Sequence, residues 1–578
     1  MNTIQEIFLS RIKDSADDIY IHYKKERTEP FCSITYRVFA ERVRSFATSL
    51  QQLGISNGER VLISAESSPE WIISDFALIN IGAISVPVFP TLTAKQVEYI
   101  LIDCGAVATI VSTEYQLRKI VNALDSLPDL HTVIVMDSQI SLPDHSRVRF
   151  FHFTDLEKGS PEGVLEKTNA NPDDTVTIIY TSGTTGNPKG VMLTHRNLIS
   201  NVFAALEGIP QLSSSDIFLS FLPLSHAFER IASYLIFAAG CQVAYAESID
   251  SIADNMLEIR PTVMTAVPRF FERLSGRIER SRDNLSPTRK KLFDWALKVG
   301  KEHAKRIERK PVSISTRLQF RIADKLVLSK IRARTGGKIR FFVSGGAALH
   351  PELGRTFAAF GLNVLEGYGL TETSPIVAVN KLNTLEWGTV GPPLSGVEVK
   401  IADDGEILIR GANVMKGYFN DPKETSEMID PDGWLHSGDI GIINENGSLK
   451  ITDRKKSIIV LGNGKNISPA SIETLLESSH LIDQAVVIGE NRDHCSALIV
   501  LSSEALIGND QEQIQKLIDV EIQKLNRGLA SFEKIRKFLI IPEYFTIENG
   551  MMTPTLKIRR KEVEKRYAEA INLLYGDL

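Results

Sequence analysis

The segment Tyr180-Thr-Ser-Gly-Thr-Thr-Gly-Asn-Pro-Lys-Gly190 carries the clearest structural signal in this chain of 578 residues. It follows a run of Thr, Val and Ile that reads as a strand, so the loop is expected at a carboxyl end of a sheet, where open α/β folds bind ligands. Gly183 and Gly186 let backbone amides approach phosphate oxygens, and Lys189 adds positive charge. It is not a Walker A loop, because Gly190 follows the lysine. Hydroxyl donors come from Thr181, Ser182, Thr184 and Thr185.

Extended and helical patterns alternate on both sides of this loop. A helical period runs over residues 36–53 and stops at Gly54, and a second helix opens at Ser68-Pro69-Glu70. The alternation predicts parallel sheets covered by helices on both faces. Beyond residue 453 we expect a shorter βαβ-like part that ends in a long charged helix. Strands are predicted at 60–64, 84–88, 108–112, 175–180, 217–221, 242–245, 262–267 and 339–343, with a hairpin at 397–410.

The composition is that of a soluble globular protein, with 43% hydrophobic and 24% charged residues. The net charge of −5 gives no indication of nucleic-acid binding. Four scattered cysteines without a CxxC pair exclude a zinc-finger spacing and disfavour a disulfide framework, as in a reducing cytosol. The first residues have no apolar signal region, so we expect a cytoplasmic protein. The uncharged runs 76–94 and 231–246 are broken by glycine, proline or polar residues and are not expected to span a membrane.

One segment, residues 277–334, is strongly basic, with 18 Lys/Arg and 6 Asp/Glu. Its apolar residues recur at helical spacing. The favoured interpretation is a solvated helical insert with its own apolar seam. The alternative is a surface attracted to anionic lipid at the inner face of a membrane, or to an acidic partner.

Three further motifs suggest nucleotide chemistry. Ser344-Gly-Gly-Ala-Ala348 follows a predicted strand and offers a flat surface that is poor in side chains. In Glu366-Gly-Tyr-Gly-Leu-Thr-Glu372, Tyr368 can stack on a base, Thr371 can donate to a phosphate oxygen, and Glu372 is a hard ligand suited to Mg²⁺. Asp439, at the end of Trp434-Leu-His-Ser-Gly-Asp439, can accept hydrogen bonds from ribose hydroxyls.

In their order along the chain, these motifs resemble those of the adenylate-forming superfamily, which includes acyl-CoA synthetases, luciferases and peptide-synthetase adenylation domains. The resemblance runs over nearly the whole chain. It implies an α/β fold in which residues 1–453 form two stacked, mostly parallel sheets flanked by helices, plus a small β-subdomain. Residues 454–578 would form a small, mobile α+β domain.

The resemblance also assigns roles to single residues. Gly345, Gly346 and Ala347 would lie against adenine, with Glu366 and Gly367 beside them, and Thr184 would add a hydroxyl near the metal. Arg454 would reach the ribose, and Lys456 would be the hinge. Lys557, in Met552-Thr-Pro-Thr-Leu-Lys-Ile-Arg-Arg560, would be the catalytic lysine. Gly462, Gly464 and Lys465 would border the thiol channel.

Long-chain fatty-acid–CoA ligases and acyl-carrier-protein synthetases are the members that the chain resembles most, through Leu222–Arg230, Ala266–Arg273 and Thr-Pro-Thr-Leu-Lys557. The resemblance implies that ATP and Mg²⁺ activate a long-chain fatty acid to an acyl-adenylate, which then passes to CoA with release of AMP and pyrophosphate. His226 would gate the acyl channel, or is simply a hydrogen-bonded histidine near a strand end. The phosphopantetheine of acyl carrier protein is the alternative acceptor. A luciferase-like oxidative enzyme is a different alternative, and a binding protein without catalysis is disfavoured.

Overall fold

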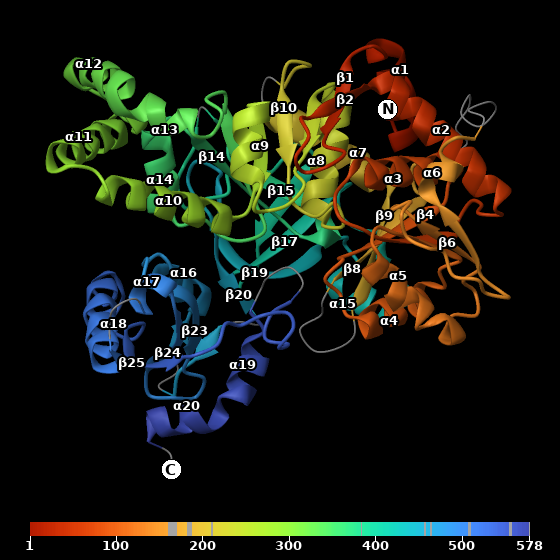
Figure 1. The fold of residues 1–578 in the computed structure, drawn as a ribbon. Coiled ribbons are helices and arrows are strands. Elements are labelled where there is room, and N and C mark those ends of the chain that lie inside the picture. The colour runs from red at the N-terminus through yellow and green to blue at the C-terminus, as the bar shows by residue number, and fades with distance from the viewer. Residues whose placement is uncertain are drawn as a thin grey trace. The chain divides into compact units, whose positions relative to one another are not determined.

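The computed structural model describes residues 1–159, 170–181, 188–209, 212–382, 384–455, 458–462, 465–506, 510–553 and 558–576. These form two compact units (Figure 1). The first comprises Met1–Phe271, Ser281–Val399 and Leu408–His436, and the second Glu272–Arg280, Lys400–Ile407 and Ser437–Leu578. The domain boundary between residues 453 and 454 stays a prediction.

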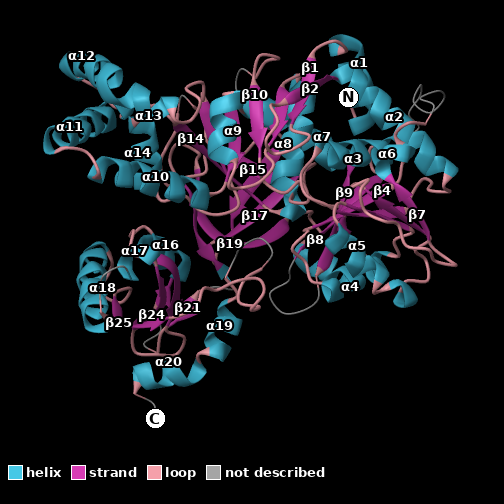
Figure 2. Ribbon diagram, in the orientation of Figure 1, coloured by secondary structure: helices cyan, strands magenta, loops and turns pink. Residues whose placement is uncertain are grey.

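Two large sheets make up the first unit, as Figure 2 shows. The first sheet has the strand order β15-β14-β13-β12-β10-β11-β1-β2 and is parallel except at its two edges, where β15 and β2 run antiparallel. Its strands are β1 (Ile19–Tyr23), β2 (Cys32–Thr35), β10 (Ile217–Ser220), β11 (Gln242–Tyr245), β12 (Val263–Ala266), β13 (Phe341–Ser344), β14 (Asn363–Gly369) and β15 (Ile376–Val379).

The second sheet has the order β18-β9-β8-β4-β3-β5-β6-β7. Its strands are parallel from β8 to β7, while β9 is antiparallel to both of its neighbours, β8 and β18. They are β3 (Arg60–Ser64), β4 (Ile84–Val88), β5 (Ala108–Val111), β6 (Thr132–Val135), β7 (Arg149–His152), β8 (Thr175–Thr181), β9 (Lys189–Thr194) and β18 (Gly417–Tyr418).

Helices cover both sheets, so the two stacked, mostly parallel sheets predicted for this part are confirmed. The helices up to the basic segment are α1 (Ile4–Ser15), α2 (Tyr36–Gln52), α3 (Pro69–Ile81), α4 (Ala94–Cys104), α5 (Glu114–Val121), α6 (Phe153–Leu156), α7 (His195–Gly208), α8 (Ala227–Ala239) and α9 (Ile252–Ile259). After these come α10 (Pro268–Asp283), α11 (Pro287–Ala304), α12 (Ile314–Ala323), the π-helix Asp324–Leu328, α13 (Ser329–Ala333), α14 (Pro351–Ala359) and α15 (Pro422–Met428).

Local signals explain several element boundaries. The hydroxyl of Ser68 accepts a hydrogen bond from the Trp71 N–H at 3.2 Å, and Pro69 occupies the first turn of α3. That helix ends at Gly82, whose φ of 75° is left-handed. The strands predicted at 60–64, 84–88 and 242–245 have the same bounds as β3, β4 and β11.

Helix α8 is fixed to the second sheet by a buried arginine. Arg230, which is 2% exposed, donates at 2.6 Å each to Ser85 of β4 and Thr177 of β8. It also pairs with the carboxylate of Asp75 from α3, and it donates to the Tyr234 hydroxyl at 2.9 Å. Because a buried guanidinium is strongly unfavourable unless paired, this set of partners determines where α8 can lie against the sheet.

The neighbouring residue fixes the same helix to the first sheet. The Glu229 carboxylate, also 2% exposed, accepts hydrogen bonds from Ser220 of β10 and Thr265 of β12. Burial raises the pKa of Glu229 to about 7, although those two hydrogen bonds oppose the increase. Consecutive residues of α8 therefore bind opposite sheets.

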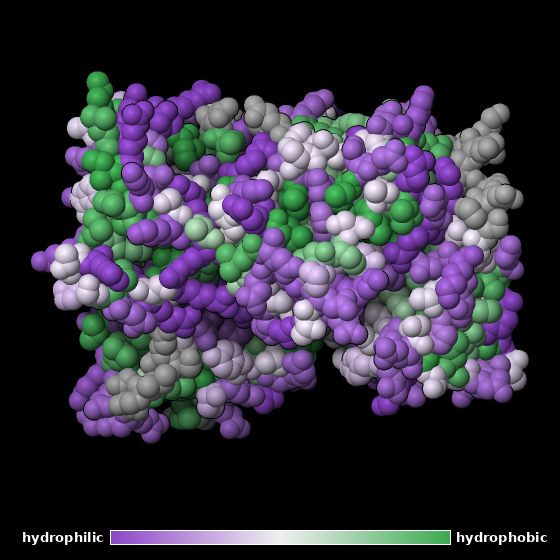
Figure 3. Space-filling model, turned by 45° about the horizontal axis from the view of Figure 1, so that its top comes forward, coloured by the Kyte–Doolittle hydropathy of each residue, from purple (hydrophilic) through white to green (hydrophobic). Residues whose placement is uncertain are grey.

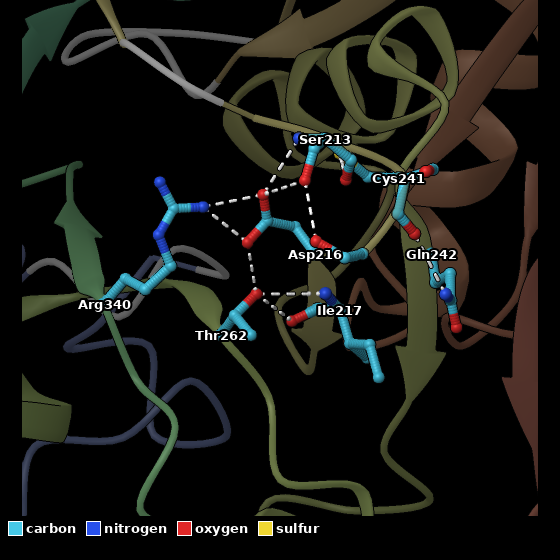
Figure 4. A network of polar contacts seen from close by, with 9 residues as sticks. Ser213, Asp216, Ile217, Cys241, Gln242, Thr262 and Arg340 are labelled. Atoms are coloured by element: carbon cyan, nitrogen blue, oxygen red, sulfur yellow. Dashed lines mark hydrogen bonds and ion pairs between the residues drawn. The ribbon is translucent and has the colours of Figure 1, made fainter.

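Asp216 fastens the amino ends of four parallel strands in the first sheet (Figure 4). Its carboxylate accepts hydrogen bonds from Arg340, immediately before β13, at 2.6 and 2.7 Å, and from Thr262, immediately before β12, at 2.8 Å. Its backbone carbonyl accepts from Gln242 N–H, at the start of β11, at 2.9 Å. Aligning the strands at this edge also aligns their carboxyl ends at the opposite edge, where sheets of this type bind ligands.

The second unit contains a small three-stranded sheet between helices (Figure 2). Side chains of β23 and β24 alternate between a core with α16 and α18 and a core with α19 and α20. The long charged terminal helix predicted here is wrong, because two short helices end the described chain. The elements are β23 (Ile482–Ile488), β24 (Cys495–Leu501), β25 (Ile535–Ile541), α16 (Pro469–Glu477), α17 (Ser503–Leu506), α18 (Gln511–Leu525), α19 (Arg560–Arg566) and α20 (Ala568–Tyr575).

A further sheet of four strands forms the predicted small β part. The expected turn at residues 403–405 is present, since Gly405 N–H donates to the Ala402 carbonyl at 2.8 Å. Its strands are β16 (Val397–Ile401), β17 (Glu406–Gly411), β19 (Leu435–Ile443) and β20 (Leu449–Arg454).

In the described ranges of the chain, no helix has both the length and the apolar character that crossing a bilayer requires. The uncharged run 76–94 falls within α3, β4 and their flanking turns, and 231–246 falls within α8 and β11.

Glu229 predicts a pH-dependent stability. Its folded-state pKa of about 7 lies above the ordinary value of 4.5. The stability that Glu229 adds to the folded protein is therefore fully present below pH 4.5 and is lost as the pH rises through 7. Glu229→Gln cannot ionise. The unfolding free energy of Glu229→Gln minus that of wild type should therefore be larger at pH 8 than at pH 5, by roughly 2–3 kcal/mol.

Thermal unfolding of the two proteins across this pH range measures the difference. Glu26→Gln, at an exposed position, is the matched control and should follow wild type. A Glu229→Gln profile that runs parallel to wild type would contradict the assignment of Glu229 as a buried, titrating carboxyl.

Candidate nucleotide-binding site

The glycine- and hydroxyl-rich loop connects two antiparallel strands. Thr181 ends β8 and lies opposite Lys189, the first residue of β9. A Walker A loop instead joins a strand to a helix, so the hairpin setting agrees with the exclusion of that motif. The predicted phosphate-binding residues Ser182, Gly183, Thr184, Thr185 and Gly186 lie outside the described residues.

Lys189 has an anionic partner within the protein. Its ammonium forms an ion pair with Glu424 of α15 and lies 5.6 Å from the ring centre of Tyr418. Both side chains of the pair are about one-third exposed, at 31% and 34%. The lysine is therefore held at the base of the hairpin, within reach of solvent.

Tyr418 of β18 contacts Glu372, a contact that the sequence analysis did not predict. Its hydroxyl donates to Oε1 of Glu372 at 2.9 Å. Burial, followed by the negative charge of Glu372, raises the pKa of Tyr418, so the hydroxyl remains a hydrogen-bond donor. The Met415 N–H also donates to the Glu372 carbonyl, at 2.8 Å. The segment around β18 thus orients the carboxylate predicted to hold a metal.

Two predicted nucleotide motifs lie at the carboxyl ends of the neighbouring parallel strands β13 and β14. Ser344 at the end of β13 lies opposite Glu366 of β14. Because the two strands run in the same direction, Gly345–Ala347 and Gly367–Tyr368 emerge at one edge of the sheet. The structure therefore brings together the residues predicted to contact adenine.

Gly345 is small for a specific reason. A Cβ atom there would lie 3.1 Å from the ring of Phe228, which belongs to the first turn of α8. The small residue lets the helix approach this edge. Gly345, directly after β13, therefore lies against the first turn of α8.

Glu366 is buried rather than exposed to a cleft. The residue is 6% exposed, and burial raises its pKa to about 7. Hydrogen bonds from the backbone of Leu349 and Gly388 oppose this increase. Its predicted contact with the nucleotide stays a prediction.

The second glycine of Glu366-Gly-Tyr-Gly369 is required by the backbone. A Cβ atom at Gly369 would lie 1.6 Å from the carbonyl oxygen of Pro375. The 3₁₀ turn Thr371–Thr373 follows this close approach, and Thr371 and Glu372 are both half-buried in it. The half-buried Tyr368 lies opposite Ala378 in β15.

In the second unit, Asp439 and Arg454 lie directly opposite each other in the β19–β20 pair. Arg454 Nε donates to Oδ1 of Asp439 at 2.9 Å, and the carboxylate side chain is 4% exposed. The antiparallel register explains why two residues so far apart in sequence form one charged pair. Next to them, Lys455 pairs with Asp404 and Glu406 at 2.6 and 2.9 Å.

Two short strands flank the predicted thiol-channel segment. β21 (Ile459–Val460) and β22 (Asn466–Ile467) are antiparallel, and Gly462 N–H donates to the Arg492 carbonyl at 2.8 Å. Lys465 Nζ lies 5.7 Å from the ring centre of Phe532. Three further predicted residues, Gly464, Lys456 and Lys557, lie outside the described residues.

His226 caps α8. Its Nδ1 accepts a hydrogen bond from Phe228 N–H at 3.1 Å, and its ring lies edge-on to Phe89, with centroids 6.1 Å apart. His226 is therefore a hydrogen-bonded histidine, as one of the two interpretations of the sequence predicted. Its role in an acyl channel stays a prediction.

In the part of the chain that the structure describes, no group of three or more His, Cys, Asp or Glu residues is arranged to hold a metal ion. The single carboxylate of Glu372 suits a metal ion that takes most of its ligands from the substrate and from water. Mg²⁺ in nucleotide sites is commonly held by one or two carboxylates together with substrate phosphates and water.

Comparison with known proteins gives matches along almost the whole chain. The sequence model described as AMP-binding enzyme matches residues 11–419, and the one described as AMP-binding enzyme C-terminal domain matches 456–578. A long-chain-fatty-acid–CoA ligase of Mycobacterium bovis is 35% identical, covering 97% of this chain and 95% of its own. Long-chain-fatty-acid–CoA ligase 5 of Rattus norvegicus is 33% identical, covering 100% and 89%.

A solved structure shares the fold. The adenylation domain of a carboxylate reductase from Mycobacterium chelonae matches with a TM-score of 0.81 at 22% identity, covering 99% of this chain and 91% of the other.

Gly369 and Gly528 provide a matched test of the site geometry. Gly369→Ala must displace the backbone around Pro375, whereas a Cβ at Gly528 would meet no atom within 4 Å. We predict at least about a tenfold loss of ATP affinity for Gly369→Ala, equivalent to roughly 1.4 kcal/mol, and little change for Gly528→Ala. Titration calorimetry measures both. Equal affinities in the two variants would show that this turn does not position the nucleotide.

Proposed function

The chain belongs to the AMP-binding enzyme family, and from this membership we propose that it activates a long-chain fatty acid with ATP and transfers the acyl group to CoA. The observation that carries the proposal is its similarity, along nearly the full length of both chains, to proteins named long-chain-fatty-acid–CoA ligases. The paired edge motifs and the Asp439–Arg454 pair support it, because they offer groups suited to a base, a phosphate and a ribose.

The reaction has two steps with opposite electrostatic demands. A carboxylate oxygen first attacks the α-phosphorus of ATP, the new acyl–phosphate bond forms, and pyrophosphate leaves. Two anions must approach each other in this step, so positive charge and hydrogen-bond donors have to offset their repulsion. The CoA thiolate then attacks the acyl carbon, and AMP leaves with the bonding electrons.

Residues of this chain can be assigned to the first step. Tyr368 would stack on adenine, and Thr371 would donate to a phosphate oxygen. The Asp439 carboxylate would accept from the ribose hydroxyls, with Arg454 beside it. Lys557 would place its ammonium between the attacking carboxylate and the α-phosphate. A preorganised donor of this kind contributes roughly 3–4 kcal/mol to transition-state stabilisation.

Glu372 fits Mg²⁺ as the accompanying metal ion. It offers hard oxygen donors, is half-buried, and has one oxygen oriented by the Tyr418 hydroxyl. When bound, Mg²⁺ supplies positive charge that neutralises the phosphates. Tyr418 restricts the carboxylate to one orientation, and the hydroxyl of Thr184 would be a neighbouring ligand.

For the second step, we assign the loop Gly462–Lys465, including Gly464, to the thiol channel and Lys456 to the hinge between the two reaction arrangements. His226, at the start of α8, would border the acyl chain. CoA is the proposed acceptor. The phosphopantetheine arm of acyl carrier protein is the second candidate, and it changes the partner rather than the class of reaction.

A ladder of fatty acids from acetate to stearate tests this proposal. Each methylene buried in an apolar channel contributes about 0.8 kcal/mol, so kcat/KM should increase by up to about fourfold per methylene until the channel is full. Release of AMP from ATP and Mg²⁺ should therefore be greatest with long chains. CoA and acyl carrier protein are offered in separate reactions.

Faster AMP release with acetate or an amino acid than with palmitate would contradict the substrate assignment. Thioester formation with acyl carrier protein but not with CoA would replace the acceptor and leave the adenylation step in place.

A further inference from the structure

Helix α12 and the π-helix that continues it carry an apolar stripe on the molecular surface. Ile314, Leu318, Ile322 and Leu326 are 75%, 56%, 54% and 43% exposed. Successive members are four residues apart, so they lie along one side of the helix. In a surface helix of a globular protein, the apolar side is normally turned into the core.

The opposite side of the same helix is packed. Phe320 stacks on His303 of α11, with ring centroids 3.7 Å apart and planes within 8°. Ala323 and Leu328 are fully buried, and Arg332 ties the continuing helix to the Phe360 carbonyl at 2.9 Å. The helix is therefore held in place by one side while its apolar stripe faces solvent.

Positive charge accompanies the stripe. Arg317, Arg321 and Lys325 are exposed and each immediately precedes an apolar member of the stripe. Within the described residues, none of these three forms an ion pair with another side chain. The surrounding segment 277–334 has 18 Lys/Arg against 6 Asp/Glu. Figure 3 shows apolar surface along the side of the molecule where α12 lies, bordered by hydrophilic surface.

We propose that α12 is a membrane-docking helix, which inserts its aliphatic stripe into the headgroup region of an anionic bilayer. Long Arg and Lys side chains can extend to lipid phosphates while their methylenes remain in apolar contact. Each cation near such a surface strengthens binding to it. An aliphatic stripe flanked by unpaired cations suits this environment better than a protein interface, whose centre is usually depleted of charge.

Docking at a membrane also fits the substrate, and this part of the argument rests on the proposed function. A long-chain fatty acid partitions into bilayers because of its many methylenes. Binding to the bilayer would place the enzyme where its substrate is concentrated.

The test measures binding of the full-length protein to vesicles, without fatty acid, ATP or CoA, so its outcome is independent of the enzyme activity. Vesicles contain either phosphatidylcholine alone or phosphatidylcholine with phosphatidylglycerol. One variant replaces the stripe (Leu318→Gln, Ile322→Gln, Leu326→Gln), and another replaces the charges (Arg317→Gln, Arg321→Gln, Lys325→Gln).

Each variant has a matched control on other exposed helical positions. The stripe control is Ile102→Gln with Val520→Gln and Leu573→Gln, at residues 53%, 65% and 65% exposed. The charge control is Arg118→Gln with Lys423→Gln and Lys516→Gln, whose side chains are 71%, 87% and 74% exposed. Thermal unfolding verifies that all variants are folded.

We expect wild type to bind anionic vesicles, with binding that weakens as salt increases. Both α12 variants should bind at least about tenfold more weakly, because each removes three groups that contact the bilayer. The controls should bind like wild type. Equal binding of wild type to both kinds of vesicle, or wild-type binding by the stripe variant, would overturn the proposal. A wild-type dimer that the stripe variant dissociates would identify the stripe as a subunit interface instead.

Discussion

The rest of the first unit depends on the hydrogen bonds by which two neighbouring residues of α8, Glu229 and Arg230, attach this helix to different sheets. One side chain binds strands β10 and β12 of the first sheet, and the other binds β4 and β8 of the second. Both groups are buried, and leaving either without partners would cost several kcal/mol. The start of α8 is therefore fixed relative to both sheets, and with it His226 and the Phe228 ring that packs on Gly345.

Buried hydrogen bonds also align the strands of the first sheet with one another. The Asp216 network holds the amino ends of four strands, so the carboxyl ends are aligned as well. At that aligned edge, loops can carry glycines and polar side chains without disturbing the core. Gly369 shows how closely the loop is built, since its backbone touches the Pro375 carbonyl where a Cβ cannot fit. A rigid edge of this kind preorganises the donors that the adenylation step requires.

Much of this arrangement is predictable from the sequence, because the signals are local. Strands β3, β4 and β11 follow from apolar runs between turn residues, and α3 from its Ser68 cap and Pro69. The motif of Asp439 and the family resemblance of Arg454 assign both residues to the ribose, and the antiparallel register explains why they pair with each other. The contact between Tyr418 and Glu372 could not be predicted, since it joins side chains that are 46 residues apart in the sequence. The basic character of residues 277–334 was visible in the sequence, but the exposure of the α12 stripe depends on which side packs against α11.

Adenylation requires that a carboxylate oxygen of the fatty acid bonds to the α-phosphorus of ATP. Palmitate labelled with ¹⁸O in both carboxylate oxygens, incubated with the protein, ATP, Mg²⁺ and CoA, tests this bond directly by mass spectrometry of the products. We expect AMP to carry one ¹⁸O atom and palmitoyl-CoA to retain the other. Unlabelled AMP, or label in inorganic phosphate with formation of ADP, would contradict adenylation and show that activation takes another route.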